Sequence, residues 1–138
     1  MDTCPQRMPL EMRIMGDSEV TLSPQRHNIF GTCSMEILTL HDATDIWQPY
    51  AQTVLDKWTS YKDAAGRPLN IRPHWAKEWF GYRVGGVLWQ DKLRTETYRD
   101  EIKEFMQLLQ KIGAKHGWTL ADIKRRFSNE LLDMMFFQ

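Results

Sequence analysis

Apolar and polar residues alternate with a period of two in two stretches near the start of the chain. In residues 9–15 the apolar side chains fall on one face of an extended backbone and the charged ones on the other, and a turn signal at Gly16 and Asp17 follows. Residues 32–40 alternate in the same way and are enriched in Thr and Ile. The pattern therefore predicts strands at 9–15 and 32–40. On the first strand the apolar face holds Leu10, Met12 and Ile14, and the charged face holds Glu11 and Arg13.

Helical spacing replaces this alternation further along the chain. Polar residues at 42–45 offer helix caps, and apolar residues then recur three or four positions apart, which predicts a helix. A second stripe follows Thr97 and Asp100, which have the spacing of a capping box, and ends near Gly113 or Gly117. The first stripe consists of Ile46, Tyr50, Val54, Leu55, Trp58 and Tyr61, and the second of Tyr98, Ile102, Phe105, Met106, Leu109 and Ile112.

The remaining segments complete the predicted order of elements. A turn at 64–68 precedes a third strand at 69–75, and three glycines indicate an irregular backbone at 80–94. Thr119 and Asp122 have the capping spacing again and predict a short last helix. This order predicts an α+β fold in which helices pack on one face of a mostly antiparallel sheet.

Composition narrows the class of protein. A chain of 138 residues with 42% hydrophobic and 12% aromatic residues is typical of one folded domain. The 18 lysines and arginines balance the 18 aspartates and glutamates, which argues against nucleic acid as a partner. The basic run Lys124 to Arg126 is then interpreted as a solvated helix face.

Cysteines, histidines and apolar runs exclude several further classes. Cys4 and Cys33 are too few for a disulfide framework, so free thiols are expected, with Cys33 buried. The four histidines are too scattered for a zinc site. The chain shows no apolar run typical of a signal peptide or a membrane span, which favours an intracellular location.

The densest candidate chemistry lies at residues 71–77. Pro73 favours an extended backbone at Arg72, and on a strand Trp75 and Lys77 would share one face, with His74 on the other. An ammonium beside an indole suits an anionic, hydroxylated or flat aromatic ligand, but ordinary packing beside a solvated lysine gives the same pattern. The charged face of the first strand is equally ambiguous between a grip on a polar ligand and a solvated surface.

Four short motifs in this order resemble the C-terminal part of FAD-dependent oxidases of the vanillyl-alcohol-oxidase superfamily. The relevant branch holds aldonolactone oxidases (D-arabinono-1,4-lactone and L-gulonolactone oxidases), alditol oxidases and type II cholesterol oxidases. Its members show Glu-x-Arg, Leu-Ser-Pro, Arg-Pro-His-Trp-Gly-Lys and a terminal Phe-Thr-Asn, whereas this chain has Ala76 in place of the glycine and Ser128 in place of the threonine. The resemblance covers nearly the whole chain. The matching segments are Leu10 to Arg13, Leu22 to Pro24, Arg72 to Lys77 and Phe127 to Asn129.

The resemblance implies oxidation of a carbinol in a sugar lactone, polyol or sterol, with FAD as cofactor and oxygen as acceptor. It implies that Lys77 and Arg13 hold the substrate hydroxyl and the flavin edge, and that Glu11 orients Arg13 or accepts from a substrate hydroxyl. His74 is either a proton partner or a structural residue, and both interpretations stay open. Asn129 either hydrogen-bonds near the flavin or serves as a capping or turn residue.

The family binds FAD on an N-terminal domain through a glycine-rich loop, and Gly85-Gly86 is only an isolated pair. We therefore expect residues 8–138 to be the substrate-binding (cap) segment, with 1–7 a short extension, incomplete without an FAD domain and inactive alone. The expected partners are a small hydroxylated substrate and a missing or separate FAD domain; family members also often associate with membranes. The alternative is a non-catalytic remnant that binds a small ligand or a protein.

Overall fold

The computed structural model describes residues 5–6, 8–40 and 43–137. It confirms an α+β fold with antiparallel strand pairing, divided between two hairpins instead of a single sheet. The strands are β1 (Glu11–Met15), β2 (Thr32–Glu36), β3 (Arg83–Val84) and β4 (Val87–Leu88). The helices are α1 (Thr44–Thr59), α2 (Trp89–Lys92), α3 (Arg99–His116), α4 (Leu120–Phe127) and α5 (Glu130–Phe136), and a π-helical turn, η2 (Leu93–Thr97), joins α2 to α3.

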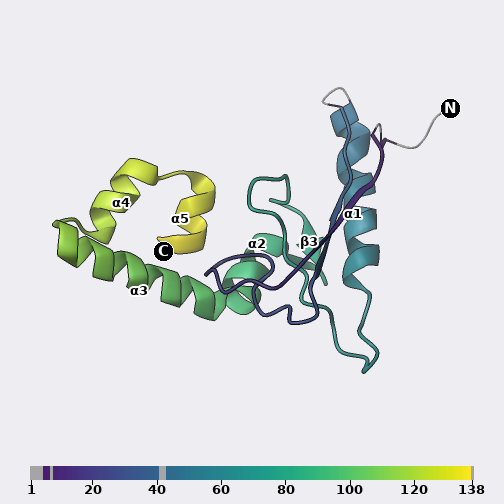
Figure 1. Cartoon of the computed structure of the whole chain (residues 1–138). Helices are drawn as coiled ribbons and strands as arrows, with labels where there is room; N and C mark the ends of the chain where they lie inside the picture. Colours follow the sequence, from purple (N-terminus) through teal and green to yellow (C-terminus); the bar gives the residue numbers. More distant parts are fainter. Residues whose placement is uncertain (1–4, 7, 41–42, 138) are drawn as a thin grey trace.

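The three C-terminal helices lie at one end of the molecule and α1 at the other, with α2 and β3 between them (Figure 1). Gly117 ends α3 in the left-handed conformation, with φ of 72°. The capping box of Thr119 and Asp122 then starts α4 as predicted, and Asn129 caps α5. These caps let α5 return to α3, where the rings of Phe105 and Phe136 lie 5.4 Å apart.

The core is rich in aromatic residues and connects the middle of the chain to the helices. Tyr98 and Leu93 are fully buried, and the rings of Trp75 and Tyr98 lie 5.1 Å apart. In α1 the buried positions include Trp47 and Leu55, whereas Ile46 of the predicted stripe is exposed. The core residues are Leu55, Trp79, Tyr82, Trp89, Leu93, Tyr98 and Met135. None of the helices in the described residues is long and apolar enough to cross a lipid bilayer.

Two predictions for the segments between the helices are wrong. Residues 69–75 are not a strand, because Arg72 and Trp75 use side chains, not a backbone ladder, to bond with the loop at residues 22–23. Residues 80–94 are not irregular: Gly85 and Gly86, with φ of 61° and 81°, form the turn of the β3–β4 hairpin. Positive φ at both central residues is what a tight hairpin turn requires.

Two predicted boundaries also change. The second strand ends at Glu36 and does not reach residue 40. Thr97 and Asp100 do not form a capping box, because the chain is already helical when it enters α3 and the N-cap position falls on Tyr98.

The β1–β2 hairpin turns its apolar face outward. Met12 pairs with Met35 and Ile14 with Cys33, and because paired residues share a face, these four side chains lie together. Met12 is 63% exposed and Ile14 73% exposed. Cys33 is a free thiol, as predicted, but it is exposed and not buried. The face that is partly covered is the polar one, which carries Ser34 and Glu36.

Candidate functional site

Three of the predicted site residues lie around one carboxylate, that of Glu36. The ammonium of Lys77 lies 2.5 Å from Glu36 Oε1. Across the hairpin Glu36 pairs with Glu11, whose Oε2 accepts a hydrogen bond of 2.6 Å from Arg13 Nη2. The side chains of Lys77 and Arg13 are 53% and 68% exposed, so both cations remain open to a ligand.

The electrostatics of this cluster depend on Glu36. The hydrogen bond and charge of Lys77 lower the pKa of Glu36, with smaller contributions from Arg13 and His74, although partial burial acts in the opposite direction. Glu36 is therefore ionised at neutral pH and holds Lys77 in place. The sequence prediction did not include Glu36. The signal was present, because a hairpin of the two predicted strands can set Glu36 opposite Glu11, and two like charges need a nearby cation.

A turn at residues 74–77 directs the side chains of the candidate segment 71–77 toward different parts of the molecule. The Lys77 N–H donates to the carbonyl of His74 over 3.0 Å, so Trp75 and Lys77 do not share a strand face. Trp75 is partly buried and packs against the core, while Lys77 reaches the hairpin. His74 is exposed and its Nδ1 accepts from the Ala76 N–H over 3.2 Å, which leaves the proton of the neutral ring on Nε2.

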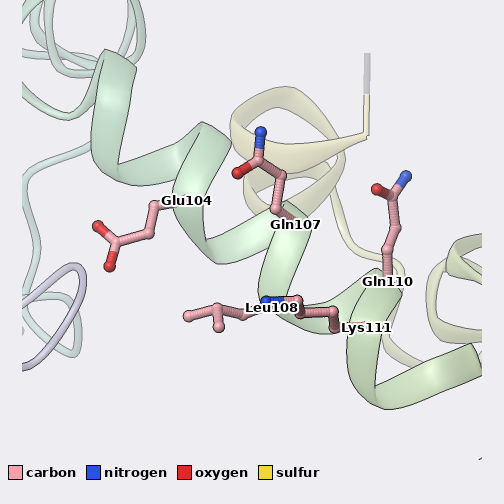
Figure 2. Close-up of a pocket in the computed structure, with 5 residues that line it drawn as sticks. All are labelled: Glu104, Gln107, Leu108, Gln110 and Lys111. Atoms are coloured by element: carbon pink, nitrogen blue, oxygen red, sulfur yellow. The ribbon is translucent and has the colours of Figure 1, made fainter. Parts of the chain in front are cut away.

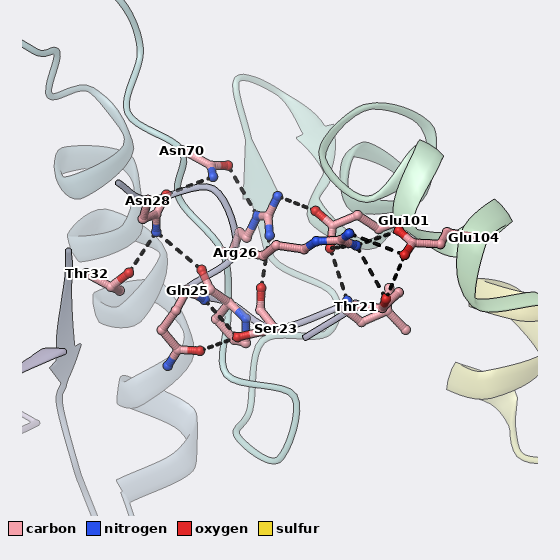
Figure 3. A network of polar contacts seen from close by, with 12 residues as sticks. Thr21, Ser23, Gln25, Arg26, Asn28, Thr32, Asn70, Glu101 and Glu104 are labelled. Carbon is pink, nitrogen blue, oxygen red and sulfur yellow. Dashed lines mark hydrogen bonds and ion pairs between the residues drawn. The ribbon is translucent and has the colours of Figure 1, made fainter. Parts of the chain in front are cut away.

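Arg72, from the same segment, belongs to a buried polar network. Its Nη2 lies 2.6 Å from Glu101 Oε1, its Nη1 donates to the carbonyl of Ser23 over 2.9 Å, and its guanidinium lies 4.5 Å from the centre of the Tyr98 ring. The side chains of Arg72 and Glu101 are only 5% and 9% exposed. Figure 3 shows how this network continues from Glu101 to Arg26 and Glu104.

This network fixes the backbone of the Leu-Ser-Pro motif. Leu22 has φ of 65°, a left-handed conformation that is costly for a residue with a branched side chain. Its N–H donates to Glu101 Oε2 over 3.1 Å, and its carbonyl accepts from Trp75 Nε1 over 2.8 Å. Both backbone groups of Leu22 are thus held by side chains of distant segments, Glu101 of α3 and Trp75. Neither Glu101 nor this role of Arg72 was predicted from sequence.

Asn129 lies at the start of α5, where its Oδ1 accepts from the Leu132 N–H over 2.8 Å. The capping interpretation of this residue is therefore confirmed, and its role at a flavin stays a prediction. With Phe80, Glu130 and Leu131 it lines an open depression. The ring of Phe136, in the same helix, lies 6.2 Å from the ring of Trp75 between centres. The helix that begins at the fourth motif, Phe127 to Asn129, therefore packs against the third motif, Arg72 to Lys77.

The described residues fit only one side of a flavin. Lys77 and Arg13 supply cations that suit the edge of an electron-rich ring, but Gly85-Gly86 is a hairpin turn and does not form a phosphate-binding loop at a helix start. Figure 2 shows a second open depression, lined only by residues of α3, including Leu108 and Lys111. Among the described residues no group of three or more His, Cys, Asp or Glu side chains is placed to hold a metal.

No protein-family profile, curated protein or solved structure matches this chain. The resemblance to the flavin oxidases therefore rests on the four short motifs alone. In the structure three of these motifs lie close together. Trp75 of the third motif binds the backbone of Leu22 in the second motif. Lys77 of the third motif contacts β2, the strand that pairs with Arg13 and the rest of β1.

Proposed function

We propose that this chain is the substrate-side segment of an FAD-linked oxidase that oxidises a carbinol of a sugar lactone, polyol or sterol with oxygen as acceptor. The observation that carries the proposal is the cluster of Lys77, Arg13 and Glu11 around Glu36. Two exposed cations held by carboxylates on a hairpin are suited to grip a hydroxylated ligand and to offset negative charge that develops during its oxidation.

Each residue of the cluster has a distinct task in this proposal. Lys77 and Arg13 hold the reacting hydroxyl and face the flavin edge, while Glu36 and Glu11 keep the two cations in position. His74 donates from Nε2, because its Nδ1 is already occupied by the Ala76 N–H. When bound, FAD would accept the hydride from the carbinol carbon and pass the electrons to oxygen.

The proposal requires an FAD domain in addition to these residues, because the described residues lack a pyrophosphate-binding loop. A ring must be held firmly against the substrate carbon for hydride transfer, and this chain offers only one side of such a site. We therefore expect no hydrogen peroxide from the chain mixed with FAD and a sugar lactone, polyol or sterol.

The test is to mix the chain with a separately produced flavin domain of an aldonolactone oxidase and to measure peroxide formation. Lys77→Met should lower turnover on the order of 10²-fold, because the lost cation acts where charge develops. Lys92→Met is the matched control, since Lys92 is also a partly exposed lysine paired with a carboxylate, that of Glu96 at 2.6 Å. Turnover with Lys77→Met within a few-fold of the Lys92→Met chain would contradict the role of Lys77.

The second candidate is a non-catalytic module that binds a small ligand or a protein. The outward apolar face of the β1–β2 hairpin favours it, because such a face on a folded domain typically marks an interaction surface. Binding of a protein partner together with no response to any flavin domain would favour this candidate over the oxidase.

A further inference from the structure

The outer edge of β1 is an unpaired strand edge in an exposed position. β1 pairs only with β2, and no isolated bridge of the described residues involves it. Residues 11–14 are all exposed, so nothing in the described chain covers this edge. An open edge without a proline or bulge inside the strand is a template for pairing with another strand.

We infer that this edge pairs with β1 of a second copy of the chain, antiparallel and centred on Met12. In that register Glu11 lies opposite Arg13 of the partner subunit, and Arg13 lies opposite Glu11 of the partner subunit. Leu10 likewise faces Ile14 of the partner subunit on the apolar side. The two-fold arrangement thus forms two opposite-charge pairs and keeps apolar residues against apolar residues.

Charge complementarity selects this register over its neighbours. A shift of one residue would place apolar side chains against charged ones across the strands. A shift of two residues would place either Glu11 against Glu11 or Arg13 against Arg13 of the partner subunit, and like charges directly opposite are destabilising. The sequence of β1 is therefore self-complementary in one alignment only.

The hairpin itself supplies a second reason. Within one subunit Glu11 lies directly opposite Glu36, another carboxylate on the same face. Arg13 of the partner subunit would flank Glu11 from its free side and add to the two cations, Arg13 and Lys77, that face this pair of carboxylates within one subunit. β2 also has an open edge, but antiparallel pairing centred on its middle residue, Ser34, brings together no opposite charges. This inference does not rest on the oxidase proposal. Glu11 and Arg13 take part in both, whereas Lys77 contacts β2 and is not used in the pairing of the two β1 strands.

The first arm of the experiment tests the register with cysteine pairs, in chains that carry Cys4→Ser and Cys33→Ser. Met12→Cys should form a disulfide-linked dimer under mild oxidation, because residues directly opposite in antiparallel strands have Cα atoms about 4.5–5.5 Å apart. Ile14→Cys alone should not, since its copy would lie about 13 Å away along the strand, four residues at about 3.3 Å each. A mixture of Leu10→Cys and Ile14→Cys chains should link.

The second arm tests the charges by sedimentation equilibrium, which separates a 16.4 kDa chain from a species of twice that mass. Glu11→Arg or Arg13→Glu alone should weaken self-association at least tenfold, because each turns both charge pairs into repulsive ones. An equimolar mixture of these two variants should restore the dimer, and so should the double variant Glu11→Arg with Arg13→Glu. This restoration also excludes misfolding as the cause of the loss.

Three results would overturn the inference. One is a chain that stays at 16.4 kDa up to millimolar concentration. Another is a dimer that the single charge reversals do not weaken, which would indicate that the apolar faces pack against each other instead. The third is linking of Ile14→Cys as readily as Met12→Cys, which would exclude the register. Because none of these measurements uses flavin or peroxide, failure here is distinguishable from failure of the oxidase proposal.

Discussion

The ion pair of Arg72 with Glu101 and that of Arg13 with Glu11 have the same chemistry and the same separation, 2.6 Å, in opposite environments. The side chains of the first pair are 5% and 9% exposed, and those of the second are 68% and 45% exposed. A buried pair is costly to break because the remaining charge cannot return to water, whereas an exposed pair contributes little to stability. The buried pair therefore serves the fold, and the exposed cation is available for a ligand or a partner.

Removing one member of each pair is the strongest test of this difference between the buried and the exposed ion pair. Arg72→Met should lower the free energy of unfolding by about 3–5 kcal/mol, because it removes the closest cation from the buried carboxylate of Glu101. Arg13→Met, the matched change at the exposed pair, should cost less than about 1 kcal/mol. Urea unfolding followed by near-ultraviolet circular dichroism measures both.

Arg72→Lys is a milder change at the same position, and it keeps the test usable if Arg72→Met does not fold. It keeps the charge near Glu101 but loses the planar group that contacts Ser23 and the Tyr98 ring together, so we expect an intermediate loss of stability. Equal effects of Arg72→Met and Arg13→Met would show that burial does not distinguish the two pairs.

Trp75→Phe tests a smaller part of the buried region. It removes the N–H that binds the Leu22 carbonyl and should destabilise the fold by about 1–2 kcal/mol, since a partly buried acceptor loses its donor. Trp58→Phe is the control, because Trp58 is half-buried on α1 and its indole N–H donates to no group of the described residues. A loss no larger than that of Trp58→Phe would mean that the Leu22 loop is held by Arg72 and Glu101 alone.

The exposed cluster should give the smallest effect, and a pH-dependent one. The pKa of Glu36 is lowered in the folded state, so its ion pair with Lys77 contributes fully above the ordinary value of 4.5 and is lost as the pH falls through the lowered pKa. The difference in unfolding free energy between the wild-type chain and Glu36→Gln should therefore shrink with acidification. Urea unfolding at a series of pH values measures it, and a difference that does not change with pH would show that Glu36 is not stabilised by charge.

Several features that depend only on neighbouring residues were predicted from the sequence, although the capping box of Thr97 and Asp100 was not found. The alternation of β1, the left-handed stop at Gly117 and the capping box at Thr119 are all local, and the structure has each of them. The Gly85-Gly86 turn was equally local but was interpreted as a loosened backbone, although two glycines between β-branched and apolar residues are typical of a tight hairpin.

Features that join distant segments were not predicted in detail. An extended stretch with Pro73 has the pattern of a strand, yet here Arg72 reaches Glu101, 29 positions away, and Ser23, 49 positions away. The gathering of Lys77, Arg13 and Glu11 was expected from the resemblance, but Glu36 was not recognised as the residue that joins them. Periodicity identifies which face a residue occupies and carries no information about which distant segment meets that face.

The π-helical turn before α3 accommodates one extra residue without changing the direction of the helix that follows. Tyr98 donates its N–H to the carbonyl of Leu93, five positions back, over 2.7 Å, so this turn holds one residue more than an α-helical turn. Each residue of an α-helix advances the direction of the side chains by about 100°. Deleting one exposed residue of this turn, such as Glu96, should therefore restore an α-helical turn and leave Glu101 directed at Arg72. Deleting Asp100, which lies between the turn and Glu101, would instead rotate Glu101 about 100° away from Arg72. Alignment of the buried ion pair is in this sense a matter of counting residues, and not only of which residues are present.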